Sequence, residues 1–153
     1  MPLARLVYAA EVIPDSGAAI ARVHAADFNP ATTAILDAPP PCDLGPAPAA
    51  PGTAEIVSHE PTRWQIRTRN DASGLLILAE NAYPGWGVTV DGQPAAALTA
   101  YTSVRAVCVP DGEHLVEWRF APQLYLLGGG ITVGSLVLVL AAVVALRRPG
   151  LNH

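Results

Sequence analysis

The residues whose types could do chemistry gather in the second half of the chain. Glu80 and Asp91 are two carboxylates of the kind that glycoside chemistry uses as a pair. Between them lie Tyr83 and Trp86, whose rings could stack on the apolar face of a sugar. The simpler interpretation is that Glu80 ends a strand, Asp91 begins a hairpin turn and the rings anchor the turn and the sheet. We therefore expect no catalytic carboxylate pair and keep Tyr83 and Trp86 as candidate glycan contacts.

The sequence contains no pattern typical of a metal site, a phosphate-binding loop or a catalytic nucleophile. The four histidines have no metal-ligand spacing and are His24, His59, His114 and His153. No glycine-rich phosphate loop opens a helix, and no serine stands in a nucleophile-elbow motif. The sequence therefore predicts no metal, no cofactor and no catalytic residue.

The two cysteines leave one question open. Cys42 lies in a proline-rich segment, and Cys108 lies inside an apolar strand. Cys108 is most simply a small buried apolar side chain. A Cys42–Cys108 disulfide is the alternative, and it would need an oxidising compartment outside the cytoplasm.

The composition is unusually apolar and slightly acidic. Hydrophobic residues make up 51% and charged residues 14%, and the formal net charge is −4. This apolar content excludes an intrinsically disordered chain, and the acidic balance disfavours a nucleic-acid binder. The apolar excess is concentrated in residues 124–146, which contain no charge and no proline. A helix over this range is roughly 35 Å long, enough to cross a bilayer core of about 30 Å, so the segment predicts a transmembrane helix.

The charges around this span predict its orientation. Arg147 and Arg148 follow it directly, so the positive-inside rule places the tail 147–153 in the cytoplasm and residues 1–123 outside. The N-terminus has no signal-peptide pattern. We therefore expect the chain to be the C-terminal part of a longer polytopic protein, and a tail-anchored cytoplasmic domain is the alternative.

The first third of the chain predicts a strand–helix–strand segment and a loop. In residues 1–36, strands at 3–13 and 32–36 flank a helix at about 16–26, with Asp15-Ser16 as its N-cap. This segment is expected to pack beside the following domain. Residues 37–53 are proline-rich, which predicts a stiff extended loop that acts as a spacer.

Residues 54–123 predict an antiparallel β-sandwich or jelly-roll-like domain. Apolar and polar residues alternate in short runs that are separated by turn residues. The expected strands are 55–59, 63–69, 75–79, 86–90, 104–109 and 114–120. The run 75–79 is apolar throughout, as expected for a strand buried on both faces. The dipeptide Asp91-Gly92 predicts a tight hairpin, because both residues tolerate positive φ. The expected fold class is thus mainly β, followed by one transmembrane α-helix.

One run is more specific than its secondary structure. Tyr83-Pro84-Gly85-Trp86 leads to Val90-Asp91-Gly92, and an Arg-Ala-Val segment and a Pro-Asp-Gly-Glu-His segment follow. The positions that carry this pattern are Pro84, Gly85, Trp86, Asp91, Gly92, Arg105, Pro110, Gly112, His114 and Pro122. Their order resembles the C-terminal region of the bacterial YfhO family of polytopic membrane proteins. Asp27-Phe28-Asn29-Pro30 resembles an upstream element of the same family.

The resemblance implies a role in the cell envelope. Full-length members of the family resemble glycosyltransferases that use lipid-linked sugar donors, and their catalytic acids lie in early extracytoplasmic loops without a counterpart here. The chain would then be a non-catalytic extracytoplasmic β-domain with a membrane anchor. Its expected partners are the lipid bilayer, other membrane helices, the catalytic loops, and a glycan or lipid-linked sugar. The alternative is a free-standing, membrane-anchored module that binds carbohydrate or pairs with other helices through Gly130 and Gly134.

Overall fold

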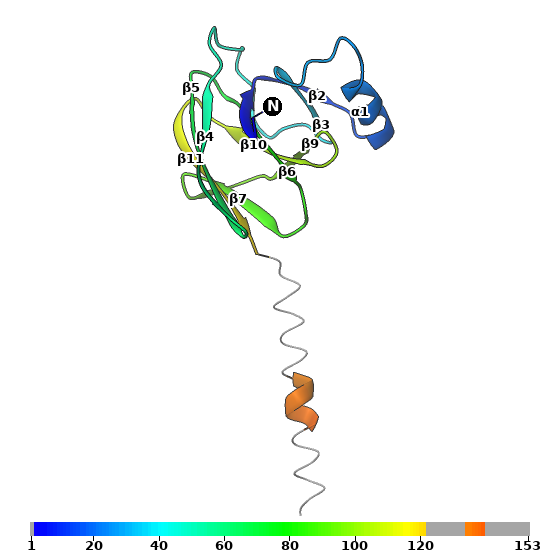
Figure 1. The fold of residues 1–153 in the computed structure, drawn as a ribbon, viewed down its shortest axis with the longest axis vertical. Coiled ribbons are helices and arrows are strands. Elements are labelled where there is room, and N and C mark those ends of the chain that lie inside the picture. Colours follow the sequence, from blue (N-terminus) through cyan, green and yellow to red (C-terminus); the bar gives the residue numbers. More distant parts are fainter. Residues whose placement is uncertain (1, 122–133, 140–153) are drawn as a thin grey trace, which may run out of the picture. The chain divides into compact units, whose positions relative to one another are not determined.

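The computed structural model describes residues 2–121 and 134–139 of the 153-residue chain. The chain divides into two units, Met1–Ala121 and Pro122–His153, and the first is mainly β (Figure 1). Residues 134–139 of the second unit are helical. Within the described residues, no helix has both the length and the apolar character that crossing a membrane requires. The predicted span 124–146 lies outside the described residues except for 134–139.

The strands of the first unit form two sheets. The six-stranded sheet has the order β1 (Ala4–Val7), β6 (Gly74–Asn81), β10 (Val104–Val109), β9 (Leu98–Ala100), β3 (Thr33–Leu36) and β2 (Ala9–Val12). The five-stranded sheet has the order β4 (Thr53–Glu60), β5 (Arg63–Asn70), β11 (Gly112–Phe120), β7 (Trp86–Val90) and β8 (Gln93–Ala95). Only β2 and β3 pair in parallel among these strands. The helix α1 (Ser16–Val23) connects them. The prediction of a mainly β domain is confirmed.

The two sheets share one hydrophobic core. Its buried side chains come from alternate positions of strands in both sheets, among them Leu76, Leu78, Val107, Ile66, Val116 and Trp118. Because successive side chains of a strand point to opposite faces, these apolar side chains share one face of each strand and the residues between them lie on the other. β11 shows this alternation, because Val116 and Trp118 are buried while Leu115 and Arg119 are exposed.

A second core lies on the other face of the six-stranded sheet. Leu75, Leu76, Ile77 and Leu78 of β6 are all 0% exposed, so this strand is buried on both faces, as predicted. Leu75 and Ile77 pack in the second cluster, which Leu44 helps to cover. The strand's continuous apolar character is therefore explained by two cores rather than one.

The proline-rich segment closes this second core and is more than a spacer. Cys42 of the segment forms a disulfide with Cys108 of β10, and Gly45 N donates a hydrogen bond to Ser73 O at 2.9 Å. The interpretation of Cys108 as a free buried thiol is therefore wrong. A segment rich in proline can form no sheet ladder, so side-chain packing and a covalent bond hold it in place.

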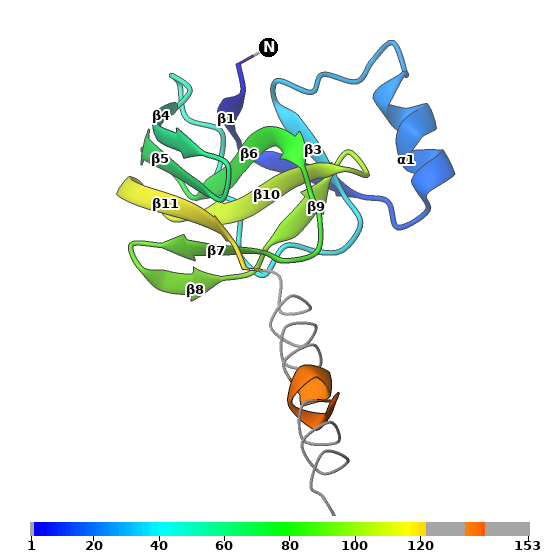
Figure 2. The ribbon, with the colours of Figure 1, turned by 60° about the horizontal axis from the view of Figure 1, so that its bottom comes forward.

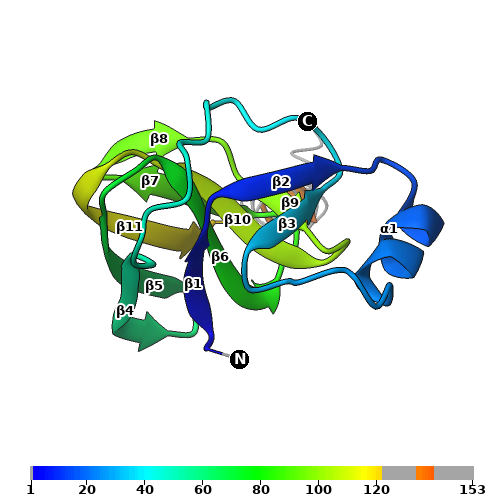
Figure 3. The same cartoon turned by 90° about the horizontal axis from the view of Figure 1, so that it is seen from above.

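The N-terminal strand is divided in two at Tyr8. β1 pairs with β6, whereas β2 pairs with β3 at the far end of the same sheet. Figure 3 shows the chain turning between β1 and β2. The Tyr8 hydroxyl accepts a hydrogen bond from Gly52 N at 3.1 Å, which ties the bend to the end of the proline-rich segment. Residues 1–36 therefore supply strands to the six-stranded sheet instead of packing beside it.

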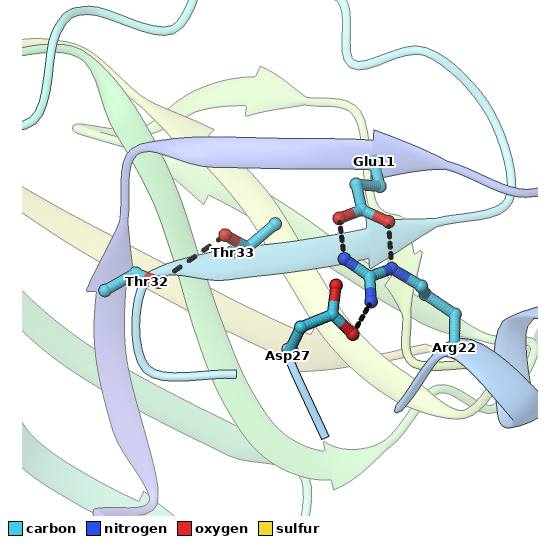
Figure 4. Close-up of polar contacts among 5 residues, drawn as sticks. All are labelled: Glu11, Arg22, Asp27, Thr32 and Thr33. Carbon is cyan, nitrogen blue, oxygen red and sulfur yellow. Dashed lines mark hydrogen bonds and ion pairs between the residues drawn. The ribbon is translucent and has the colours of Figure 1, made fainter. Parts of the chain in front are cut away.

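The helix α1 is capped and docked by charged side chains. Asp15 is its N-cap, as predicted, and accepts a hydrogen bond from Ala18 N at 2.7 Å. Arg22 of α1 donates two hydrogen bonds to Glu11 of β2, at 2.8 and 2.9 Å, and one to Asp27 at 2.9 Å (Figure 4). The hydrogen bond from Arg22 lowers the pKa of Glu11. The helix ends at Val23, earlier than predicted.

The sequence did not predict two short strands. β8 and β9 are three residues each and contain too few residues to show a period. The Asp91-Gly92 turn before β8 has φ values of 52° and 79°, as the hairpin prediction requires. A second turn with positive φ, at Tyr101 and Thr102, connects β9 to β10.

Candidate functional site

The candidate glycan contacts lie where β6 is connected to β7, Tyr83 in the turn and Trp86 at the start of β7. Gly85 has φ of 103°, a conformation that favours glycine. Gly85 O accepts a hydrogen bond from Ala121 N at 2.8 Å, and Ala82 N donates to Ser103 O at 2.7 Å. Figure 2 shows this connection passing the end of β11. The turn is therefore fixed to the last described residue of the first unit and to the β9–β10 turn.

Tyr83 and Trp86 have different surroundings. Tyr83 is 62% exposed, and its hydroxyl accepts a hydrogen bond from Asn81 Nδ2 at 3.4 Å. Trp86 is half-buried, with the Phe120 ring centroid 5.3 Å from its own. The guanidinium carbon of Arg105 lies 3.7 Å from the centre of the Trp86 ring. One face of Trp86 is thus covered by Arg105, and Tyr83 is the more exposed of the two rings.

Arg105 is a buried cation between the two sheets. Arg105 is 4% exposed, and its guanidinium carbon also lies 5.8 Å from the Trp118 ring centre. Nε of Arg105 donates to Asn81 O at 2.9 Å. Burial lowers the pKa of Arg105, and the charge of Glu80 opposes this shift. Because Arg105 belongs to the six-stranded sheet and both tryptophans to the five-stranded sheet, the stack joins the sheets.

The polar atoms of this stack are not all paired. Within the described part of the chain, Arg105 Nη1 and Trp118 Nε1 are buried donors without a hydrogen-bond partner. The attraction between a cation and an aromatic face offsets part of the cost of burying the guanidinium. The arrangement is suited to holding the sheets together, because its charged group is shielded from solvent.

Asp91 and His114 meet at the turn that follows β7. His114 Nδ1 lies 2.7 Å from Asp91 Oδ2, and His114 Nε2 lies 2.9 Å from Asp111 O. Asp91 Oδ1 also accepts a hydrogen bond from Leu115 N at 2.8 Å. The hydrogen bond to Asp91 raises the pKa of His114, and the same bond lowers the pKa of Asp91.

This pair is arranged as a structural contact. Both ring nitrogens of His114 face acceptors, which favours the doubly protonated imidazolium. A general base needs a free ring nitrogen that faces a substrate, so His114 would have to break one contact to act. Glu80 has no part in this pair, because its charge acts on Arg105 beside Trp86, at the other end of β7.

The remaining positions of the pattern that begins at Pro84 and ends at Pro122 shape turns. Gly92 and Gly112 have φ of 79° and 115°. Pro110 O accepts a hydrogen bond from Asn70 Nδ2 at 2.6 Å, which joins two turns at one end of the sheets. Pro84 lies in the β6–β7 turn, and Pro122 lies outside the described residues. The structure therefore brings residues of this pattern together in two places, Trp86 with Arg105 and Asp91 with His114.

Sequence reasoning missed a network of charges on the outer face of the five-stranded sheet. Glu117 accepts hydrogen bonds from Arg63 at 2.9 and 2.6 Å, from Gln65 at 2.9 Å and from Arg119 at 2.8 Å. The bond from Arg63 is the main reason that the pKa of Glu117 falls to about 2. The signal was the recurrence of charged residues at alternate positions of β5 and β11, which places them opposite each other once the strands pair.

Two hollows lie away from the predicted site residues. A groove of about 440 Å³ is lined by Pro2, Ala4, Arg5, Leu6, Ala31, Pro51, Gly52, Thr53 and Ala54. A smaller hollow of about 70 Å³ is lined by residues of α1, β3 and the β9–β10 turn, with the segments that flank them. Among the described residues, no three His, Cys, Asp or Glu side chains are grouped so that they could hold a metal ion.

Comparisons with known proteins leave these contacts as the basis for interpretation. No protein-family model matches the chain, and neither the curated proteins nor the solved structures include a match.

Proposed function

We propose that this chain is a non-catalytic β-domain displayed on the extracytoplasmic side of a bacterial membrane. The segment 124–146 anchors it as a transmembrane helix, and the tail 147–153 lies in the cytoplasm. The domain is the C-terminal part of a YfhO-like membrane protein that takes part in cell-envelope glycosylation. Its work is to pack against the catalytic loops of that protein or to hold a glycan or lipid-linked sugar near them.

The observation that carries the location is the Cys42–Cys108 disulfide. It joins residues 66 positions apart and holds the proline-rich segment on the six-stranded sheet. Structural disulfides form and persist in oxidising compartments and are rare in the cytoplasm. This supports the outside placement independently of Arg147 and Arg148.

The described part of the second unit supports a lipid environment. Leu136, Val137, Leu138 and Val139 are 61%, 59%, 73% and 59% exposed. Consecutive residues of a helix point in different directions, so apolar side chains are exposed around this helical turn. Such a surface is costly in water and suited to hydrocarbon.

The packing of the first unit supports the β-sandwich assignment. Two sheets that face each other across one core of alternating side chains are the defining feature of that class. The contacts of Arg105 with Trp86 and of His114 with Asp91 support a scaffold role, because they hold sheets and turns together instead of facing a ligand.

A redox and topology measurement tests the proposal. The full chain is isolated from cells with its thiols trapped by a maleimide polymer, and a protease is applied to spheroplasts in parallel. We expect no polymer addition before reduction, two additions after reduction, and cleavage of the first unit from outside. Cys42→Ser/Cys108→Ser is the control that shows no addition in either case. Two reactive thiols in the chain as isolated would overturn the outside placement.

Carbohydrate binding is the second candidate, and the exposure of Tyr83 favours it. An exposed aromatic ring on a fixed turn is a common platform for a sugar face. Tyr83→Ala tests this without breaking the Arg105 stack, which Trp86→Ala would do. Saturable binding of an envelope glycan by the full chain in detergent, lost in Tyr83→Ala, would support this candidate. A flat titration would reject it.

A further inference from the structure

Tyr83 is conspicuous among the aromatic residues of the first unit. At 62%, it is more exposed than any other large apolar or aromatic residue described in 2–121. Its position is nevertheless fixed, because its turn is bonded to Ala121 and Ser103 through the backbone. Tyrosine combines an apolar ring with a polar hydroxyl, which suits a boundary between apolar and aqueous surroundings.

The covalent chain limits what this turn can approach. Gly85 O accepts a hydrogen bond from Ala121 N at 2.8 Å. Residues 122 and 123 alone separate Ala121 from the start of the apolar segment 124–146. Three residue steps of chain reach at most about 11 Å. If the segment enters the hydrocarbon core at residue 124, Ala121 lies at most about 11 Å from the edge of that core. The β6–β7 turn, which is bonded to Ala121, then lies near the lipid headgroups.

The opposite end of the sheets has a different character. The turns there carry Asp71, Asp91 and Asp111, and all three residues are next to or opposite the start of β11. β11 has 9 residues and is about 30 Å long. Asp91 is paired with His114, and Asp71 and Asp111 add two further carboxylates, which anionic lipid headgroups repel, so this end fits the position away from the membrane.

We propose that the turn Ala82–Gly85 lies at the membrane–water interface, with the Tyr83 side chain among the lipid headgroups. The inference rests on the proposed membrane anchor. Tyrosine is enriched at this depth because its ring enters the apolar boundary while its hydroxyl stays hydrated. The contact would give the domain a second attachment to the bilayer besides the covalent chain.

Spin labels on the full chain in nanodiscs of phosphatidylcholine and phosphatidylglycerol test the contact. Single cysteines are introduced as Ala82→Cys beside Tyr83, Asp71→Cys at the acidic end and Val137→Cys in the apolar segment. The native disulfide is kept, and its presence in each variant reports correct folding. The measured quantity is the ratio of collision with oxygen to collision with a water-soluble nickel complex, which rises with depth in lipid.

The positions should differ in a defined order. We expect the label at 137 to report hydrocarbon, the label at 82 to report the interface and the label at 71 to report water. Tyr83→Ser should shift the label at 82 to the aqueous value, and Tyr83→Trp should keep the interfacial value. Val57→Ser, which removes an apolar side chain that is 45% exposed elsewhere, should leave it unchanged.

The outcomes separate the two proposals. Lipid contact at 137 with an aqueous value at 82 would overturn the Tyr83 contact and leave the membrane anchor standing. Aqueous values at both 137 and 82 would overturn the anchor itself. An interfacial value at 82 that survives Tyr83→Ser would show that the turn is near the membrane without Tyr83 contributing, and would also overturn the inference.

Discussion

The guanidinium of Arg105 stacks on the ring of Trp86 at 3.7 Å and joins the two sheets through it. Both residues belong to the pattern that begins at Pro84 and ends at Pro122, although 18 intervening positions separate them in the chain. The pattern therefore marks contacts of the folded domain at least as much as a binding surface. The predictions below test how much of the stability depends on these contacts.

Arg105→Lys is expected to lower the free energy of unfolding by about 2 kcal/mol. Lysine lacks the planar group that lies flat on Trp86 and the Nε that bonds Asn81 O, yet it keeps the buried charge. Urea unfolding of the full chain measures the change. Arg67→Lys is the matched control, because its side chain is 60% exposed and it should change stability by less than about 0.5 kcal/mol. Equal effects of the two substitutions would show that the stack contributes little.

Reduction of the Cys42–Cys108 disulfide is expected to cost about 4 kcal/mol of stability. The bond closes a loop whose ends are 66 positions apart, and opening it returns chain entropy to the unfolded state. Unfolding with and without dithiothreitol gives the difference. The double variant Cys42→Ser/Cys108→Ser should unfold as the reduced chain does and should not respond to dithiothreitol. A stability unaffected by the reductant would contradict the prediction.

The Asp91–His114 contact should stabilise the domain most between about pH 4 and pH 6.5. The raised pKa of His114 means that its contribution is complete below the unfolded value of about 6.5 and is lost as pH rises through the folded value. The lowered pKa of Asp91 means that its contribution is present above about 3.9 and is lost as pH falls through the folded value.

The comparison of His114→Gln with the parent chain measures this dependence. At pH 5 the variant should be less stable by about 1–2 kcal/mol, and the difference should shrink by pH 9. Asp91→Asn is the control, since in its presence His114→Gln should show little dependence on pH over that range. A difference that stays constant from pH 5 to pH 9 would argue against an ionic contact.

Gly52→Ala should destabilise the domain strongly. A Cβ at this position would lie 2.7 Å from Arg69 O, 2.7 Å from the Tyr8 hydroxyl and 2.8 Å from Leu6 Cδ1. Since one of these neighbours is backbone, we expect a loss of about 2 kcal/mol or more. Gly87→Ala is the matched control, because the nearest atom to its added Cβ is 4.0 Å away. Thermal unfolding compares the two, and a Gly52→Ala chain as stable as Gly87→Ala would refute the close packing at Tyr8.

Most elements with a clear period could be predicted from the sequence. The six strands expected in 54–123 are present, because alternation within a single strand is a local property. The Asp15 cap and the Asp91-Gly92 turn were also predictable, since each depends on the conformational preference of neighbouring residues. The short strands β8 and β9 were not, because three residues in a strand show no period.

The partners of the candidate residues could not be predicted in the same way. The sequence predicts that Trp86 anchors the sheet, but nothing local to it indicates that Arg105 covers one of its faces. The sequence offers a Cys42–Cys108 disulfide as an alternative, but whether it forms depends on the path of a proline-rich segment that has no regular structure.

The sequence by itself determined the mainly β character, the turns, the capped helix and the apolar segment 124–146, because these follow from the types and order of neighbouring residues. Tertiary structure alone decided the bend at Tyr8, the two cores around β6, the disulfide and the pairs Arg105–Trp86 and Asp91–His114. Each of these contacts joins residues from different strands or loops. Their formation depends on strand pairing and close packing over the whole domain, which no local pattern encodes.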